Sequence, residues 1–227
     1  MTKQKILVIS PHTDDELFGC GGTLLGLKEN HSIKIVVMSC SDRYLRHLNR
    51  MVSKEEQWEE FKSCASMISN ESPVAYPIHN RLEEEHIYKA VGWLDNVIEE
   101  YNPTTILIPE PSYHQEHQIT YKLSIAACRP TYGKNSLENI MLYEIPTNTW
   151  SGVESFYKPN VYVDISNFID KKIEIFQKTY KIQYTKEKRN KLGEDGIVSH
   201  AKYRGIECGQ NYSESFMTLK SIRKTLF

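Results

Sequence analysis

Short apolar runs alternate along the first two thirds of the chain with longer stretches in which apolar and polar residues are mixed. The runs at 5–10, 33–39 and 104–108 are rich in Val, Ile and Leu, which is typical of strands buried on both faces of a sheet. Ser53 and Glu56 have the spacing of a capping box and predict a helix that ends near Ile68. The pattern predicts further helices at about 19–30, 85–101, 117–128 and 168–188, and further strands at 140–145 and 161–165.

This alternation of strands and helices indicates the fold class. Strand–helix–strand units with short connections build a parallel sheet with right-handed crossovers, so we expect an α/β, Rossmann-like, mostly parallel sheet with helices on both faces. The sequence has no internal repeat and no linker, and we expect residues 1–227 to form a single domain. The part after about residue 165 is expected to be mainly helical and packed on the same domain, with 186–200 as a candidate mobile loop.

The composition narrows the class of protein. Lys and Arg number 28 against 29 Asp and Glu, a net charge of -1, and this balance disfavours a nucleic-acid partner or a polybasic membrane surface. No apolar run reaches the roughly 20 residues of a bilayer span, and the N-terminus lacks the features of a signal peptide. The five cysteines lie far apart without a CxxC pair, which argues against disulfides or an all-thiolate zinc site. We therefore expect a cytoplasmic protein without a transmembrane segment.

Two groups of polar residues follow predicted strands at the edge where parallel sheets bind ligands. Imidazole nitrogen and carboxylate oxygen suit Zn²⁺, which in catalytic sites keeps one position for water. Two histidines and one aspartate supply three protein ligands, a second aspartate can accept the water's proton, and a third histidine can serve the developing oxyanion. Chemistry alone does not decide which aspartate has which role. The residues are His12, Asp14, Asp15 and Glu16 after the first strand, and His114 and His117 after the strand at 104–108.

Each group has a simpler interpretation when it is taken alone. Asp-Asp-Glu before a helix is common as an N-cap with carboxylates that compensate the helix dipole. A histidine pair three residues apart is often a feature of the surface. The glycine-rich stretch 19–22 lacks both the GxGxxG spacing and the P-loop lysine, so close packing of a helix on the sheet is favoured over phosphate binding. The occurrence of both polar groups at strand ends favours the metal site.

The segment PHTDDELFGCGGTL resembles the PHPDDE signature, with its following glycines, of the PIG-L/LmbE-like deacetylases. His114-Gln115-Glu116-His117 resembles the HxDH element of that family. The resemblance extends over nearly the whole chain and implies a Rossmann-like, zinc-dependent enzyme that removes acetyl groups from N-acetylglucosamine-type sugars. Further similar segments are Asn80-Arg81-Leu82, Ala127-Cys128-Arg129-Pro130, Tyr143-Glu144-Ile145-Pro146, 159–165, Arg204-Gly205, Gly209 and 212–216.

Carried over by position, the resemblance assigns a role to each residue of the two polar groups. It implies that His12, Asp15 and His117 bind zinc. Asp14 is then the general base, and His114 stabilises or protonates at the scissile carbonyl. The sequence departs from the family pattern in three places: Thr13 replaces a proline, Glu116 replaces an aspartate, and Ser39-Cys40-Ser41 replaces Thr-Asp-Gly.

Substrate contacts are expected from three residues near strand ends. Arg81 and Arg43 follow strands and have the chemistry to bind sugar hydroxyls or a phosphate, although each is also typical of a solvated surface. Tyr143 is expected to border the pocket, or else to be a half-buried strand aromatic.

The expected function is a Zn²⁺-dependent hydrolase that removes acetyl from an N-acetyl amino sugar or its conjugate through activated water, with Asp14 as general base. A His-Asp-His set also accepts Fe²⁺. One alternative is a metal-dependent amidase for another acyl group or a non-sugar amide. The other is a non-catalytic sugar or nucleotide binder, which predicts no stoichiometric metal. The resemblance permits a homo-oligomer, and the composition does not decide this.

Overall fold

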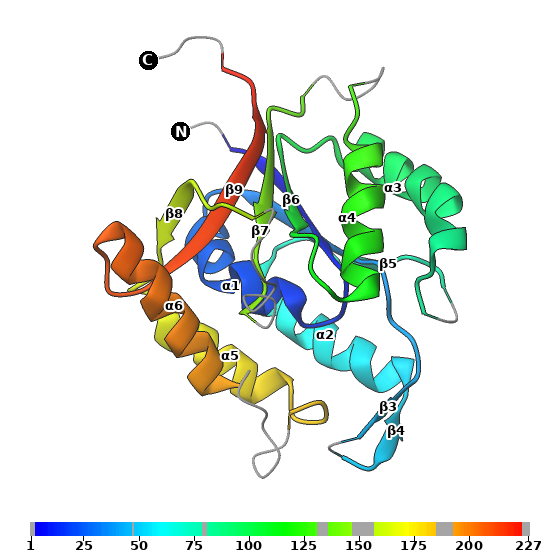
Figure 1. Cartoon of the computed structure of the whole chain (residues 1–227), viewed down its shortest axis with the longest axis horizontal. Coiled ribbons are helices and arrows are strands. Elements are labelled where there is room, and N and C mark those ends of the chain that lie inside the picture. The colour runs from blue at the N-terminus through cyan, green and yellow to red at the C-terminus, as the bar shows by residue number, and fades with distance from the viewer. Residues whose placement is uncertain are drawn as a thin grey trace.

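A seven-stranded sheet in the order β5-β2-β1-β6-β7-β9-β8 runs through the structure, a computed structural model that describes residues 3–46, 48–78, 81–130, 136–146, 157–184 and 193–223 (Figure 1). The neighbouring strands from β5 to β7 are parallel, and β9 is antiparallel to both β7 and β8. The strands are β1 (Lys5–Ser10), β2 (Ser32–Val37), β5 (Val74–Ala75), β6 (Thr105–Pro109), β7 (Asn139–Tyr143), β8 (Val161–Asp164) and β9 (Ser213–Ser221). The mostly parallel α/β sheet that the sequence predicts is confirmed.

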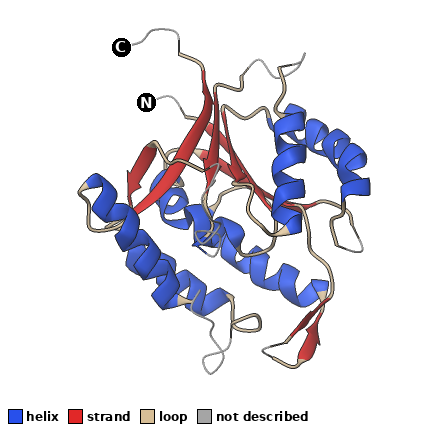
Figure 2. Ribbon diagram, viewed as in Figure 1, coloured by secondary structure: helices blue, strands red, loops and turns tan. Residues whose placement is uncertain are grey.

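Helices cover both faces of this sheet (Figure 2). Two of them, α3 (Ile87–Tyr101) and α4 (Gln115–Ala127), pack on one face, and a 3₁₀ turn at Glu84–His86 precedes α3. The other face is covered by α1 (Asp15–Leu27), α2 (Lys54–Ile68), α5 (Ile169–Thr179) and α6 (Glu194–Cys208).

The central strand β1 shows why its sequence is apolar at successive positions. Side chains alternate between the faces of a strand, so both faces need apolar residues when both are covered. Ile6 and Val8 belong to the core under α1, α2, α5 and α6, whereas Leu7 and Ile9 belong to the core under α3 and α4. A strand between two helical layers therefore lacks a polar face.

The predicted capping box at the start of α2 is present. Ser53 accepts a hydrogen bond from the Glu56 amide, and the Glu56 side chain accepts one from the Ser53 amide. The helix α1 begins at Asp15, earlier than predicted, so the acidic residues of the first motif occupy its first turn. A short hairpin of β3 (Arg43–Leu45) and β4 (Arg50–Val52), which the sequence analysis did not predict, projects beyond the end of α2 (Figure 1).

The C-terminal part differs most from expectation. The helix predicted at 168–188 ends at Thr179, and residues 194–200, which were expected in a loop, form the first turns of α6. Residues 185–192 lie outside the described part of the chain. The nine-residue strand β9 stands where a mainly helical segment was expected. Its first residues are buried although most of them are polar, so the strand does not show the apolar run that identified β1.

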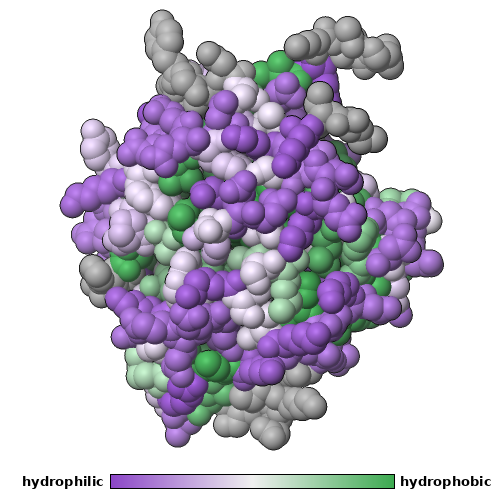
Figure 3. Space-filling model, turned by 180° about the vertical axis from the view of Figure 1, so that it is seen from behind, coloured by the Kyte–Doolittle hydropathy of each residue, from purple (hydrophilic) through white to green (hydrophobic). Residues whose placement is uncertain are grey.

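One face of the molecule shows how polar and apolar residues are distributed on the surface. On the side opposite to that of Figure 1, hydrophilic residues predominate and apolar residues form smaller patches between them (Figure 3). Within the described ranges, no helix combines the length and the apolar character that crossing a bilayer requires.

Candidate metal centre and active site

The two polar groups meet because β1 and β6 are neighbours in the sheet and end at the same edge. His12 Nδ1 lies 3.0 Å from Asp15 Oδ2 and 3.1 Å from His117 Nε2, and the last two atoms are 3.2 Å apart. We call these three atoms the ligand triangle. Around a four-coordinate zinc ion with bonds of about 2.0–2.1 Å, ligand atoms are separated by about 3.3 Å. The ligand triangle is therefore close to the size that one tetrahedral ion requires.

The outer nitrogens of both imidazole rings are held by hydrogen bonds. His12 Nε2 lies 3.0 Å from Glu116 Oε2, and His117 Nδ1 lies 3.1 Å from Ser112 Oγ. Hydrogens on these outer nitrogens leave the lone pairs of His12 Nδ1 and His117 Nε2 directed at the Asp15 carboxylate. Three electron-pair donors at such short separation need a cation between them, so the donor set fits Zn²⁺.

The groups around the ligand triangle favour a positive charge within it. Burial alone lowers the pKa of His12, but the hydrogen bonds and charges of Asp15 and Glu116 outweigh burial and raise it to about 10. Burial likewise works against the charged Asp15, yet His117 and His12 hold the pKa of its carboxyl well below the usual range. The ligand triangle is therefore built to hold positive charge.

Two of the departures from the family pattern contact each other. Glu116 accepts hydrogen bonds from Ser39 Oγ at 2.5 Å and from the Leu82 amide at 3.0 Å, besides its contact with His12. Burial raises the pKa of the Glu116 carboxyl, but these hydrogen bonds prevail and lower it to about 2. Glu116 thus orients the His12 ring of the ligand triangle, and Ser39, which follows β2, is one of the groups that donate a hydrogen bond to Glu116. The third departure, Thr13, is buried, and its carbonyl accepts a hydrogen bond from Tyr180 at 2.6 Å.

Asp14 lies beside the ligand triangle but outside it. One of its oxygens lies within 4.8 Å of a ligand atom of His12 and of Asp15. The Tyr184 hydroxyl donates a hydrogen bond of 2.7 Å to Asp14 Oδ2. Burial and the charge of Asp15 raise the pKa of Asp14, whereas the charge of Arg43 and the Tyr184 hydrogen bond oppose the rise. Asp14 is thus a buried carboxylate whose orientation is fixed from outside its own helix.

His114 contributes an exposed ring to the same centre. Its centroid lies 4.7 Å from that of His12 and 4.9 Å from that of His117. Partial burial and the neighbouring histidines lower the pKa of His114 to about 4, so its ring is neutral near pH 7. A neutral imidazole acts as a hydrogen-bond donor rather than as a cation.

The simpler interpretation as a helix cap does not account for the acidic residues. Asp14 occupies the N-cap position of α1, but its side chain makes no capping hydrogen bond. Glu16 is fully buried, accepts hydrogen bonds of 3.0 Å from both Ser10 and Tyr180, and has a pKa raised by burial to about 8. Of the three carboxylates, Asp14 and Asp15 therefore lie near the histidines. Glu16 instead stabilises the buried turn through its hydrogen bonds to Ser10 and Tyr180.

The substrate residues predicted from the sequence separate into two groups. Arg43 and Arg81 line the pocket above the ligand triangle, together with His12, His114 and Glu116. Tyr143 does not border this pocket, because it is completely buried and its hydroxyl donates a hydrogen bond to the Ile9 carbonyl at 2.9 Å. The expectation that Tyr143 contacts substrate is therefore wrong. Tyr143 lies at the end of β7, and its hydrogen bond stabilises the end of β1.

Tyr180 and Tyr184 are site residues that the sequence pattern does not reveal. Both follow α5, more than 160 residues after the motif that they contact, with separations of 164 and 170 residues to Glu16 and Asp14. The spacing of two tyrosines after the end of a helix does not indicate that they contact a carboxylate far away in the sequence. A lone aromatic in this segment was equally consistent with core packing.

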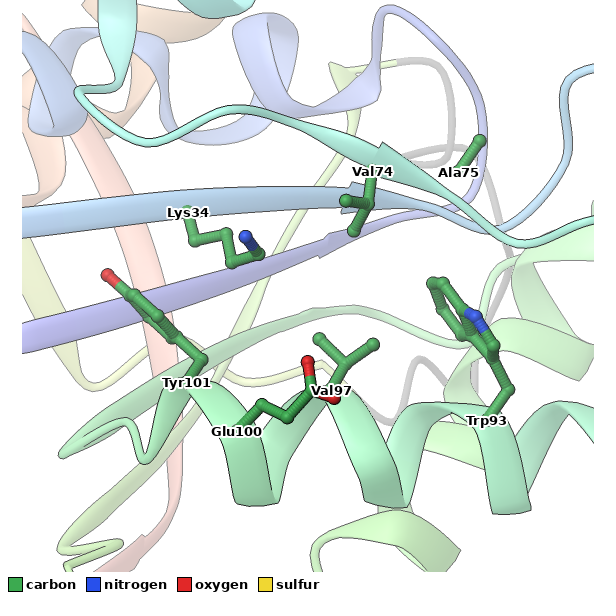
Figure 4. Close-up of a pocket in the computed structure, with 7 residues that line it drawn as sticks. All are labelled: Lys34, Val74, Ala75, Trp93, Val97, Glu100 and Tyr101. Carbon is green, nitrogen blue, oxygen red and sulfur yellow. The ribbon is translucent and has the colours of Figure 1, made fainter.

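A second depression lies between α3 and the sheet edge formed by β2 and β5. This groove has a volume of about 450 Å³ and is lined by apolar and aromatic side chains, among them Val74, Trp93, Val97 and Tyr101, with Lys34 and Glu100 at its side (Figure 4). None of its lining residues belongs to the histidine and aspartate group, so it is separate from the candidate centre.

The fold and the site define a class of protein, in which an open parallel sheet carries a histidine–aspartate cluster at the carboxyl ends of adjacent strands. The chain belongs to the PIG-L family, described as GlcNAc-PI de-N-acetylase, whose model matches residues 7–128. The matched part contains the ligand triangle, Asp14 and His114.

Individual relatives agree with this membership. The chain is 25% identical to the diacetylchitobiose deacetylase of Thermococcus kodakarensis over 229 residues, which cover 96% of this chain and 84% of that protein. The structure of N,N′-diacetylchitobiose deacetylase from Pyrococcus horikoshii with its inhibitor MPG superposes with a TM-score of 0.78 at 22% identity, covering 99% of this chain and 87% of that chain.

The fold also serves another reaction. GalB, the 4-carboxy-2-hydroxymuconate hydratase from Pseudomonas putida, superposes with a TM-score of 0.69 at 15% identity, covering 99% of this chain and 100% of that chain. Because a hydratase shares the fold, the reaction must be inferred from the site.

Proposed function

We propose that the protein is a metal-dependent hydrolase that removes the acetyl group from an N-acetyl amino sugar of the N-acetylglucosamine type, or from its conjugate. The observation that carries this proposal is the ligand triangle of His12, Asp15 and His117 with a separate buried carboxylate, Asp14, beside it. Membership of the PIG-L family and the two diacetylchitobiose deacetylases support the same reaction class.

The proposed ligands of the ion are His12 Nδ1, Asp15 Oδ2 and His117 Nε2. Zn²⁺ fits the two nitrogens and one oxygen, and Fe²⁺ accepts the same set. When bound, the ion supplies Lewis acidity at the acetyl carbonyl and lowers the pKa of a coordinated water. Glu116 and Ser112 keep both rings in the required orientation through their outer nitrogens.

The remaining residues move protons and stabilise charge. Asp14 accepts a proton from the attacking water and delivers it to the amine nitrogen when the carbon–nitrogen bond breaks, which yields acetate and a free amine. His114, as a neutral donor, hydrogen-bonds the carbonyl oxygen as negative charge develops there. Tyr184 restrains the orientation of the Asp14 carboxylate through its hydrogen bond to Oδ2.

The proposal is tested by metal analysis together with an assay for acetate release from N-acetylglucosamine, diacetylchitobiose and nucleotide-linked N-acetylglucosamine. We expect one metal ion per chain and acetate from at least one of these sugars. The variant Asp14→Asn should keep the metal and lose about 10²- to 10⁴-fold in kcat, the usual contribution of a general acid–base group.

Other results would contradict the proposal in distinguishable ways. Release of a different acid from a wider N-acyl panel, without acetate, indicates another amidase. Absence of stoichiometric metal and of turnover indicates a binding protein. Wild-type turnover in Asp14→Asn would remove the role of that carboxylate as the base.

We also propose that one domain spanning residues 1–227 carries this site, and that it works in the cytoplasm. The strands of a single sheet come from positions between Lys5 and Ser221 along the chain, and the two helical layers share that sheet. The five cysteines, all within the described residues, form no disulfide, which suits a reducing compartment.

A further inference from the structure

Two arginines line one side of the candidate active-site pocket. Arg43 lies in β3, which follows β2 in the chain, and Arg81 follows β5. The strands β2 and β5 are neighbours at the edge of the seven-stranded sheet. The ligand triangle lies on the other side of the pocket, at the ends of β1 and β6. The pocket thus runs from the proposed metal centre towards two guanidinium groups.

Two other polar side chains of the pocket wall, Ser39 and Gln57, already have partners within the protein. Ser39 Oγ donates to Glu116, and the Gln57 side-chain amide donates to the carbonyls of Ser41 at 2.8 Å and Val52 at 3.3 Å. These groups therefore hold the wall in shape. They are not the donors on which recognition of a ligand would depend.

The two arginines, in contrast, form no ion pair with the residues that the structure describes, although the charge of Arg43 acts on the pKa of Asp14. Among the described residues, neither Arg43 nor Arg81 has a carboxylate oxygen within 4.0 Å. Arg43 Nη2 donates to the neutral side chain of Gln183, and Arg43 Nε has no acceptor in the part of the chain that the structure describes.

A structural arginine of the same chain shows a different arrangement. Arg204 forms a two-pronged pair with Glu144, with Nε and Nη2 at 2.5 and 2.6 Å from the two carboxylate oxygens. A guanidinium fork matches a carboxylate or phosphate in this way. Arg43 and Arg81 present the same chemistry to the pocket without such an internal partner.

We propose that this side of the pocket is an anion subsite, and that the natural substrate is an N-acetyl amino sugar bearing a carboxylate or phosphate group. The inference rests on the proposed deacetylase function and adds the charge of its substrate. Arg43 is the principal residue of the subsite, because β3 fixes its backbone and Gln183 holds its side chain. Arg81 closes the subsite from the β5 side.

The test compares kcat/KM for neutral and anionic probes on the metal-loaded protein. The neutral probes are N-acetylglucosamine and diacetylchitobiose; the anionic probes are N-acetylglucosamine 1-phosphate, N-acetylglucosamine 6-phosphate and N-acetylmuramic acid, which separate phosphate from carboxylate. We expect at least one anionic probe to be preferred by about tenfold or more, the effect of a charged hydrogen bond. Arg43→Gln should abolish most of this preference, and Arg43→Lys should retain part of it. The ratio between probes cancels any change in kcat that affects all substrates alike.

A binding measurement provides a readout apart from turnover. Titration calorimetry of glucosamine 1-phosphate, glucosamine 6-phosphate and muramic acid, each against glucosamine, should show tighter binding of at least one anionic sugar, weakened by salt. That advantage should be lost in Arg43→Gln and reduced in Arg81→Gln. Arg46→Gln is the matched control, because Arg46 is exposed in the turn after β3 and does not line the pocket.

The outcomes separate the two proposals. Equal kcat/KM for neutral and anionic probes, with acetate released, overturns the anion subsite and leaves the deacetylase intact. A preference that survives in both Arg43→Gln and Arg81→Gln also overturns the assignment. If no probe releases acetate, the deacetylase proposal fails, and equal binding of neutral and anionic sugars then overturns the subsite as well.

Discussion

At the scale of single residues, the hydroxyl of Tyr184 determines how Asp14 is presented to the site. Removal of this hydroxyl in Tyr184→Phe leaves the ring packing in place but takes away the donor at 2.7 Å from Asp14 Oδ2. A hydrogen bond to a charged group contributes about 1.5–3 kcal/mol, so we expect kcat to fall roughly tenfold or more. The metal content should stay unchanged, because the hydrogen bond that is removed goes to Asp14 and not to an atom of the ligand triangle.

Steady-state kinetics with metal analysis checks this expectation. Tyr203→Phe is the matched control, since that tyrosine is 55% exposed on α6. Full activity in Tyr184→Phe would show that Asp14 is oriented by other contacts. Loss of metal in the same variant would show that the hydroxyl acts on the whole site and not on the base alone.

Glu110, the residue after β6, links the pH to the stability of the fold. Burial and the charge of Glu144 raise the pKa of Glu110 from 4.5 to about 8. Between about pH 4.5 and pH 8, Glu110 is therefore protonated in the folded state and ionised in the unfolded chain. The contribution of this group to the free energy of unfolding is lost as the pH rises through this range. Glu110→Gln removes this dependence.

Urea unfolding at pH 5 and pH 8 measures the effect. The free energy of unfolding of Glu110→Gln, relative to wild type, should increase between these pH values by up to a few kcal/mol, from about 1.4 kcal/mol per pKa unit. Glu99→Gln, at an exposed position of α3, is the control. An identical pH dependence in Glu110→Gln and wild type would show that the side chain ionises as readily in the folded state as in the unfolded chain.

The same scale shows what the sequence could reveal about the site. Residues within one short motif, such as His12, Asp14 and Asp15, were found because several ligand types occur together at a strand end. Tyr184 was not found, since its role depends on a hydrogen bond across 170 residues. The complete burial of Tyr143 was not predicted either. The strands that surround this side chain are set by the order of the strands in the sheet, and the residues next to Tyr143 in the sequence do not reveal that order.

At the scale of elements, the glycines of α1 determine how closely that helix approaches the sheet. A Cβ atom at Gly19 would lie 2.7 Å from the backbone oxygen of Glu144 and would overlap the Tyr143 ring, whereas at Gly92 in α3 it would meet nothing within 4 Å. This agrees with the interpretation of the glycine-rich stretch as close packing rather than phosphate binding.

The two glycines therefore predict opposite effects of the same substitution. Gly19→Ala should destabilise the protein by about 1–3 kcal/mol or more, the cost of overpacking a core. Gly92→Ala should stabilise it by about 0.5–1 kcal/mol, since alanine is the better helix former. Chemical denaturation of both variants checks the pair, and destabilisation of equal size in both would contradict the packing explanation.

The strand β9 explains where prediction of elements failed. Glu214 in this strand pairs with Lys172 of α5 at 2.7 Å and accepts hydrogen bonds from the amides of Gly22 and Thr23 in α1. The strand thus buries charge that is neutralised by two distant helices. A pattern of apolar positions identifies strands that bury side chains for their hydrophobicity, as in β1, β2 and β6, but not a strand that buries an ion pair.

At the scale of the whole molecule, strand order brings the site together. Asp15 and His117 are far apart in sequence, yet β1 and β6 lie side by side, so the loops that follow them share one edge of the sheet. The alternation of strands and helices predicted a parallel sheet, and this was sufficient to place both motifs at the same edge. It was not sufficient to place α6, β9 or the residues after α5, among which Tyr184 reaches Asp14.

Because the ligand triangle draws on the loop after β1, the first turn of α1 and the first turn of α4, metal binding should stabilise the entire fold. A ligand that binds only the folded state at 100 times its Kd adds about 2.7 kcal/mol. For a domain of this size, about 2–4 °C per kcal/mol gives a rise in Tm of about 5–10 °C with Zn²⁺ over the chelated protein.

His117→Ala should abolish this rise, because it removes one corner of the triangle. His31→Ala should keep it, since His31 precedes β2 at the opposite end of the strands. Scanning calorimetry with EDTA and with Zn²⁺ measures both, and an undiminished zinc-dependent rise in His117→Ala would place the ion elsewhere.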